Sequence, residues 1–197
     1  MTNPENTGWV GSWSPGIGDP TIIGWLTVGL YAIAAILCHR AARRCKDVAL
    51  QTYFWRRETV WWQFLAAALW FLCVNKQLDL QTAMTEIGRI LARRQGWYAE
   101  RRLYQEMFIA GLLLAGFFGA CLALIVTWRM SRSLKLAMVG FCFIGVFVLI
   151  RAGSFHHVDV LLDSRVLAIK WNWILEIGGI VVVAFAAVRR LRLMGNQ

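Results

Sequence analysis

The sequence contains little proline, which interrupts helices, and few charged residues, which make a protein soluble in water. It has three prolines in 197 residues, so long helices are open to most of the chain. Only 16% of the residues are charged, against about a quarter in soluble domains. By contrast, 58% are hydrophobic and the mean hydropathy is +0.53. Apolar content on this scale needs lipid as its solvent, which predicts a single helix bundle embedded in a membrane.

The familiar signatures of catalysis and cofactor binding are also missing. The five cysteines form no CxxC pair and are interpreted as small buried hydrophobic residues. There is no phosphate-binding loop, nucleotide fingerprint or nucleophile elbow. No histidine lies inside an apolar run, which argues against haem ligation, and no acidic residue lies in the middle of one, which argues against a proton pump. No basic, cleavable leader precedes the first run, so that run is expected to stay in the membrane.

Five apolar runs are the main feature that is present. A helix needs about 20 residues to cross about 30 Å of hydrocarbon, and the first run is about this long. Asp19 and Pro20 stand at its start, as a predicted cap and first-turn residue. The predicted membrane-spanning helices cover residues 20–38, 59–74, 107–128, 136–150 and 174–188.

The segment 79–94 shows a helical pattern of another kind. Its apolar residues recur at spacings of three and four from Leu80 to Leu91, and Glu86 and Arg89 fall on the opposite face. The segment is too polar to span a bilayer and is predicted to lie at the membrane interface. The expected fold class is therefore an all-α integral membrane protein with five spans and one amphipathic interfacial helix.

The charges are divided unequally between the two sides of this topology. The segments 39–58 and 129–135 and the tail from Arg189 carry twelve Lys and Arg residues and two acids, whereas the other side carries nine of each. The positive-inside rule makes the first side cytoplasmic, which places the N-terminus outside and the C-terminus in the cytoplasm. Basic clusters this short beside spans suit lipid headgroups, so nucleic acid is not an expected partner despite a pI near 10.0.

Polar residues concentrate on the predicted outer side, directly after the fourth span. One helical turn there would bring His156 and Asp159 together, with His157 beside them. Imidazole and carboxylate groups bind metals and transfer protons. His156, His157 and Asp159 are therefore candidate catalytic residues and candidate ligands of a divalent metal ion. The alternative is a helix-end cluster that caps backbone groups and reaches toward headgroups.

Arg151, at the outer end of the fourth span, is a further candidate catalytic residue. A charge at the membrane boundary is expensive unless it is paired. The default interpretation is an ion pair between Arg151 and Glu176 that joins the fourth and fifth spans. The sharper alternative is that Arg151 binds an anionic group of a substrate.

A second polar cluster closes the second span and continues into the interfacial helix. Asp79 and Glu86 lie two turns apart on one face, and that face could meet the histidines if it covers the mouth of the bundle. The candidate substrate-binding residues are Lys76, Gln77, Asp79, Glu86 and Arg89. The alternative is a solvated face with local pairs such as Glu86 with Arg89.

The stretches NKQLDLQ (75–81) and SFHHVD (154–159) resemble those of a group of small, functionally uncharacterised bacterial multi-pass membrane proteins. The resemblance covers most of the chain. It implies a location in the bacterial inner membrane, which makes the outer side the periplasmic one. It implies no activity.

Two functions are compatible with these features. The first is a metal-binding or catalytic site at the periplasmic face that acts on a lipid or a lipid-linked molecule. The second is a non-catalytic accessory or scaffold subunit, in which an apolar patch faces a membrane-protein partner. Membrane lipids are expected partners in both. A transporter ranks last because the span interiors offer no polar path.

Overall fold

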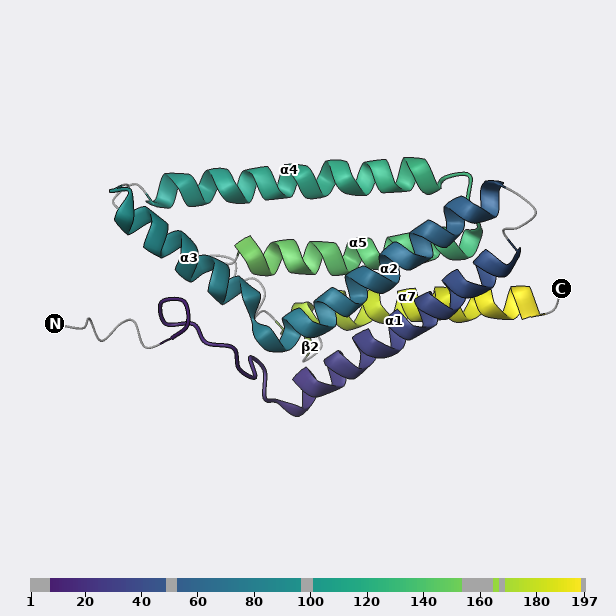
Figure 1. Cartoon of the computed structure of the whole chain (residues 1–197), viewed down its shortest axis with the longest axis horizontal. Coiled ribbons are helices and arrows are strands. Elements are labelled where there is room, and N and C mark those ends of the chain that lie inside the picture. Colours follow the sequence, from purple (N-terminus) through teal and green to yellow (C-terminus); the bar gives the residue numbers. More distant parts are fainter. Residues whose placement is uncertain (1–7, 49–52, 97–100, 154–164, 167–168, 196–197) are drawn as a thin grey trace.

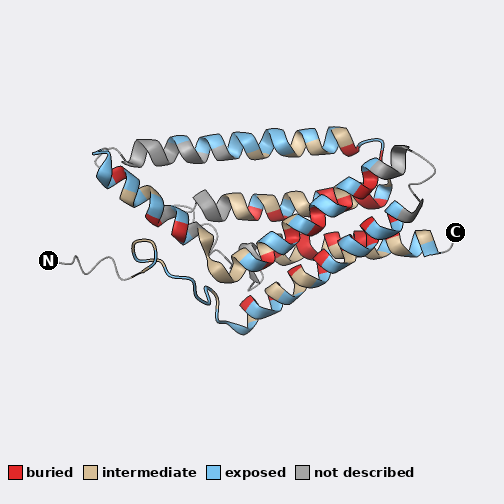
Figure 2. Ribbon diagram, viewed as in Figure 1, coloured by how far each residue is buried: buried red, intermediate tan, exposed pale blue. Residues whose placement is uncertain are grey.

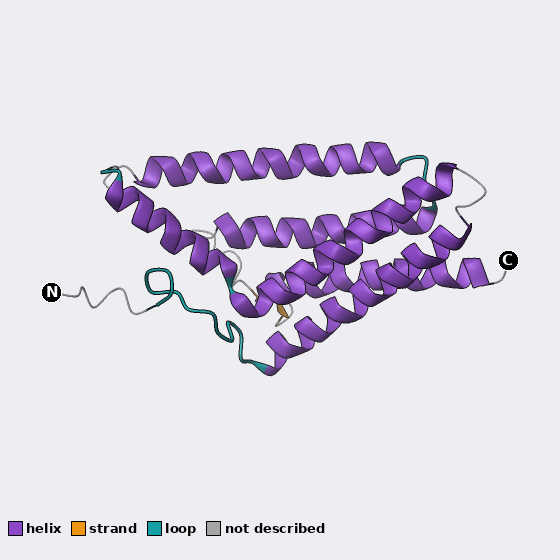
Figure 3. Cartoon of the chain, in the orientation of Figure 1, coloured by secondary structure: helices purple, strands orange, loops and turns teal. Residues whose placement is uncertain are grey.

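The computed structural model describes residues 8–48, 53–96, 101–153, 165–166 and 169–195. In this part of the chain the regular structure is helical, apart from an antiparallel hairpin of two very short strands (Figure 3). These strands are β1 (Arg165–Val166) and β2 (Ile169–Lys170). The all-α fold predicted from the sequence is confirmed.

Six helices make up the described part of the fold. In chain order they are α1 (Ile22–Val48), α2 (Tyr53–Leu78), α3 (Leu80–Arg94), α4 (Arg101–Thr127), α5 (Arg132–Gly153) and α7 (Trp171–Gly195). Except for α3, each extends beyond the apolar run that predicted it. Lys, Arg and Glu are good helix formers, so the helices continue past the end of the apolar residues. The basic stretch 39–46, for example, belongs to α1.

The start of α1 differs from the prediction in its capping residue. The N–H of Gly24 donates to Oγ1 of Thr21 at 3.0 Å, so Thr21 is the N-cap. Asp19 Oδ1 accepts hydrogen bonds from the N–H and the hydroxyl of Thr21, at 3.2 and 2.6 Å. Asp19 therefore supports the cap from outside the helix.

The long helices lie side by side and alternate in direction (Figure 1). α1 packs on α2 and on α7, α5 packs on α7, and α4 is attached to α5. Buried residues gather where α1, α2, α5 and α7 meet, whereas most of the described side chains of α4 are exposed (Figure 2). α3 leaves the end of α2 obliquely.

Small residues allow the core helices to approach closely. The buried face of α1 consists largely of such residues, namely Ala34, Ala35, Cys38, Ala41, Ala42 and Cys45. Between α5 and α7, Gly140 and Gly179 face each other, and a Cβ on either would lie 2.8 Å from the carbonyl oxygen of the other. The backbones of α5 and α7 are therefore in direct contact at this point.

Two stretches of the described chain are long and apolar enough, by length and composition, to cross a membrane. They are Ile22–Lys46 in α1 and Arg132–Leu149 in α5, and Leu113–Thr127 in α4 is a shorter apolar stretch. Large apolar side chains on α4 face outward, including Phe117 at 64% exposure and Ile125 at 71%. These features suggest a membrane protein.

The three basic segments meet at one end of the bundle, here called the basic end. The end of α1, the start of α2, the turn between α4 and α5, and the end of α7 all lie there (Figure 1). At the opposite end α2 passes into α3 through residues 77–80, here called the elbow. The elbow end also holds the start of α1, the end of α5 and the start of α7.

Candidate functional site

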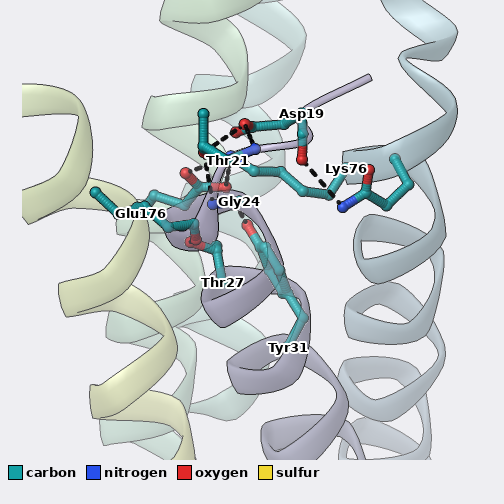
Figure 4. Close-up of polar contacts among 9 residues, drawn as sticks. Asp19, Thr21, Gly24, Thr27, Tyr31, Lys76 and Glu176 are labelled. Carbon is teal, nitrogen blue, oxygen red and sulfur yellow. Dashed lines mark hydrogen bonds and ion pairs between the residues drawn. The ribbon is translucent and has the colours of Figure 1, made fainter. Parts of the chain in front are cut away.

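A buried ion pair lies at the elbow end, between the last turn of α2 and the first turns of α7. Lys76 Nζ donates to both carboxylate oxygens of Glu176, at 3.0 and 3.1 Å. The two side chains are 10% and 5% exposed. The hydroxyl of Tyr31, from α1, donates to Glu176 Oε1 at 3.4 Å, and Lys76 Nζ lies 5.9 Å from the centre of the Phe147 ring of α5. Three helices thus supply the polar side chains of this group (Figure 4), and α5 places an aromatic ring beside it.

The ion pair borders a small cavity of about 30 Å³, which is room for about two water molecules. Its polar lining comes from Tyr31, Asn75, Lys76, Asp79 and Glu176, and its apolar lining from Leu72, Phe147 and Val148. Its lining includes one lysine, two acidic residues and the phenol of Tyr31. The cavity therefore combines a fixed cation, fixed anions and hydrogen-bonding groups in one place.

Asp79 is the residue at which α2 ends and α3 begins. Its φ is 47° and its ψ is 53°, the left-handed conformation, and it is the one non-glycine residue with positive φ among those described. Asp tolerates this conformation better than most residues. Its N–H donates to the carbonyl of Asn75 at 3.0 Å, and its Oδ2 accepts the hydroxyl of Thr82 at 2.6 Å. The unusual backbone turns α3 away from the bundle and keeps Asp79 at the cavity.

Two of the other predicted substrate-binding residues, Gln77 and Glu86, contact the N-terminal segment. The backbone carbonyl of Gln77 accepts the N–H of Gly18 at 2.6 Å, and its side-chain Nε2 donates to the carbonyl of Asp19 at 3.4 Å. The side-chain oxygen of Gln77 is buried with no hydrogen-bond partner in the described structure. Glu86, 6% exposed, accepts the hydroxyl of Ser12 at 2.9 Å.

The pair predicted as the local alternative on α3 is also present. Arg89 Nη1 lies 2.8 Å from Glu86 Oε1. The polar face of α3 therefore turns toward the N-terminal segment. Its apolar residues Met84, Ile87 and Leu91 are exposed at 66%, 44% and 44%.

Several predicted site residues cannot be placed at this cavity. His156, His157 and Asp159 lie outside the described residues, as does the side chain of Arg151, whose backbone belongs to α5. Glu176, for which a pair with Arg151 was expected, is bound by Lys76. Among the residues that the structure describes, no group of three or more His, Cys, Asp or Glu side chains is arranged to hold a metal ion.

A second buried ion pair lies at the basic end. Arg190 Nη2 of α7 donates to Glu58 Oε2 of α2 at 2.7 Å, and the side chains are 7% and 0% exposed. Ser131, in the turn before α5, donates a short hydrogen bond to the other oxygen of Glu58. The three basic segments are therefore joined through one carboxylate. We interpret this pair as structural.

Three members of these clusters were not found from the sequence. Tyr31 is the one tyrosine in the first apolar run, and its position there was the one available signal. Glu58 and Arg190 appeared to be ordinary flanking charges, because nothing in the linear pattern shows which flanking charge points inward.

Comparisons with known proteins identify no relative. The chain matches no protein-family model, and neither the curated proteins nor the solved structures gave a significant match. The functional argument therefore rests on the residues of this chain.

Proposed function

We propose that the chain is a five-span protein of the bacterial inner membrane whose elbow end binds the polar headgroup of a lipid or lipid-linked molecule. In this proposal α1, α2, α4, α5 and α7 cross the bilayer and α3 lies at the interface. The basic end faces the cytoplasm and the elbow end faces the periplasm. The apolar stretches in α1, α4 and α5 support the crossing, and the gathering of the basic segments at one end supports the orientation.

The observation that carries the proposal is the buried pair of Lys76 and Glu176 beside a polar cavity. Charges within a membrane bundle are costly, and they commonly mark binding sites. A headgroup carries a phosphate and often an amine or hydroxyl groups. Lys76 offers a cation to the first, and Glu176, Asp79 and Asn75 offer acceptors to the others.

The catalytic or metal-binding part of the proposal is supported by the connections of the chain. α5 ends at Gly153 and α7 begins at Trp171, and both ends lie at the elbow end. Both helices line the cavity, through Phe147 and Glu176. The segment between them carries His156, His157 and Asp159, which are proposed to hold a divalent metal ion or to transfer protons, with Arg151 at its start as an anion anchor.

Lipid retention tests the binding site. Asn75→Ala removes a cavity amide that has no hydrogen bond in the described structure, and it is expected to weaken headgroup binding about fivefold, for one lost bond of about 1 kcal/mol. Native mass spectrometry of protein extracted in mild detergent measures the retained lipid. Gln63→Ala is the matched control, because it removes an exposed amide from the same helix. Equal retention in both variants and the wild type contradicts the site.

Metal content tests the histidine segment. We expect about one divalent ion per chain in the wild-type protein and its loss in His156→Ala/His157→Ala, because imidazole is a common metal ligand. The measurement is elemental mass spectrometry of detergent-purified protein. His39→Ala is the control, since His39 is exposed at the opposite end. Absence of metal from both the wild type and the variant removes metal binding from the proposal.

A second function is favoured by one observation. α4 is attached to the bundle through α5 and exposes large apolar side chains along much of its length. In a bilayer this surface suits a helix of another protein as well as it suits lipid. The alternative is therefore a non-catalytic accessory or scaffold subunit. Co-purification of a membrane protein that cross-links to α4, with no lipid or metal at the elbow end, supports it.

A further inference from the structure

The N-terminal residues 8–19, here called the strap, have a defined local structure. Val10 and Trp13 form two reciprocal backbone hydrogen bonds, at 3.0 and 3.1 Å. Gly8 N–H donates to the carbonyl of Gly11 at 3.0 Å. Gly11 has a φ of +59°, which favours glycine. These bonds make a tight turn that presents Ser12 at its tip.

The strap lies against the polar groups of the elbow and of α3. Hydrogen bonds join it to these groups. These run from Ser12 to Glu86, from Trp13 Nε1 to the carbonyl of Leu78, from Gly18 to the carbonyl of Gln77, and from Gln77 to the carbonyl of Asp19. They engage Gln77 and Glu86, two of the groups that sequence reasoning assigned to a substrate.

Glycine allows this close approach at two points. A Cβ on Gly18 would lie 2.9 Å from the carbonyl oxygen of Gln77 and 3.1 Å from the Cβ of Asp79. A Cβ on Gly11 would lie 2.6 Å from Oε2 of Glu86. The strap therefore touches Asp79, which lines the cavity, and it accepts a hydrogen bond from the side chain of Gln77.

The strap buries little apolar surface in this position. Trp9 and Ile17 are 83% and 62% exposed, and the strap is held mainly by the hydrogen bonds just described. Segments with few buried apolar contacts open locally at low cost. Trp is also favoured at a membrane interface. In the proposed topology the released strap would therefore bind to the adjacent headgroup layer through Trp9.

We propose that the strap is a reversible cover of the elbow, which must leave before a ligand reaches Gln77 and the adjacent Asp79 at the edge of the cavity. This inference rests on the proposed binding function and adds regulation to it. Gly18 of the docked strap lies against Asp79, one of the groups proposed to bind the ligand, so docked strap and bound ligand compete for this space. A ligand at the elbow therefore shifts the strap toward its released state, and the docked strap weakens ligand binding by the same factor.

The accessibility of a cysteine at residue 77 tests, without any ligand, whether the strap covers the elbow. In a Gln77→Cys protein, a disulfide between Gly11→Cys and Glu86→Cys locks the strap, because the two Cβ positions lie 3.5 Å apart, within the disulfide range. A membrane-impermeant maleimide then labels residue 77 in reconstituted protein, and peptide mass spectrometry measures the rate. The same protein with the disulfide reduced is the unlocked comparison.

Labelling of residue 77 is expected to be about tenfold slower in the locked protein, because it proceeds through the open population. In a separate Gln77→Cys protein with Ser12→Ala, labelling is expected to be faster than in Gln77→Cys alone. A thiol at Arg94→Cys, exposed on α3, should react equally in all states. Equal labelling rates at residue 77 in locked and unlocked protein would overturn the proposal that the strap covers the elbow. Lipid retention is measured separately, so the loss of either result leaves the other standing.

Discussion

Glu58→Ala is expected to lower the free energy of unfolding by about 3–5 kcal/mol, because it removes the carboxylate that a buried cation faces. The Arg190 side chain is 7% exposed and its Nη2 lies 2.7 Å from the carboxylate. The same substitution removes the acceptor of the Ser131 hydroxyl. In a protein of about this length the melting temperature should fall by about 10 °C. Thermal unfolding in detergent, followed by tryptophan fluorescence, measures it.

The neighbouring Arg57 provides the matched control. Its side chain is exposed, so Arg57→Ala should change stability by less than about 0.5 kcal/mol. The double variant Glu58→Leu/Arg190→Met should regain most of the lost stability, since an apolar pair of similar volume replaces a buried ion pair well. Equal stability of Glu58→Ala and Arg57→Ala would show that the pair does not hold the basic end together.

Lys76→Met is expected to be the second most damaging change, with a loss of about 3 kcal/mol. It leaves the Glu176 carboxylate, 5% exposed, without its cation in the described structure, and the long hydrogen bond from Tyr31 compensates only in part. The same variant should also lose retained lipid, because Lys76 is the cation at the cavity. Thermal unfolding and native mass spectrometry of one preparation measure both effects.

The double variant Lys76→Met/Glu176→Leu separates these two roles. Stability should largely return, for the reason given for the basic end. Retained lipid should not return, since the cavity has lost its cation and one of its carboxylates. A double variant that is stable and retains lipid like the wild type would make this pair structural as well, and the proposed binding function would fall.

Hydropathy located the helices but underestimated their lengths. The apolar runs show where lipid is needed, whereas the helix depends on backbone hydrogen bonds that charged residues continue to support. The basic stretch 39–46 therefore extends α1, and Arg56 with Arg57 belongs to α2. α3 was predicted almost residue for residue, because its amphipathic period and the break at Gly96 are both local signals.

The candidate site could be predicted only in part, for a reason of geometry. Lys76, Gln77 and Asp79 are close in sequence, and so they had to share one end of the bundle. The partner of Glu176 depends on how α2 and α7 are rotated about their axes, which nothing in the linear pattern determines. The role of the N-terminal segment depends on the close approach of the backbone at Gly11 and Gly18 to α3 and the elbow. Glycine has no side chain from which such a contact could be predicted.

The two buried pairs also determine in which direction α7 joins the bundle. Along α2 the acid Glu58 precedes the base Lys76, and along α7 the acid Glu176 precedes the base Arg190. Opposed directions bring each acid to a base. If α7 were inverted, Glu58 would face Glu176 and Lys76 would face Arg190, so that two like-charged contacts would be buried at once. The order of these four charges along α2 and α7 therefore favours the antiparallel arrangement of the two helices. This effect is independent of the basic residues on the surface.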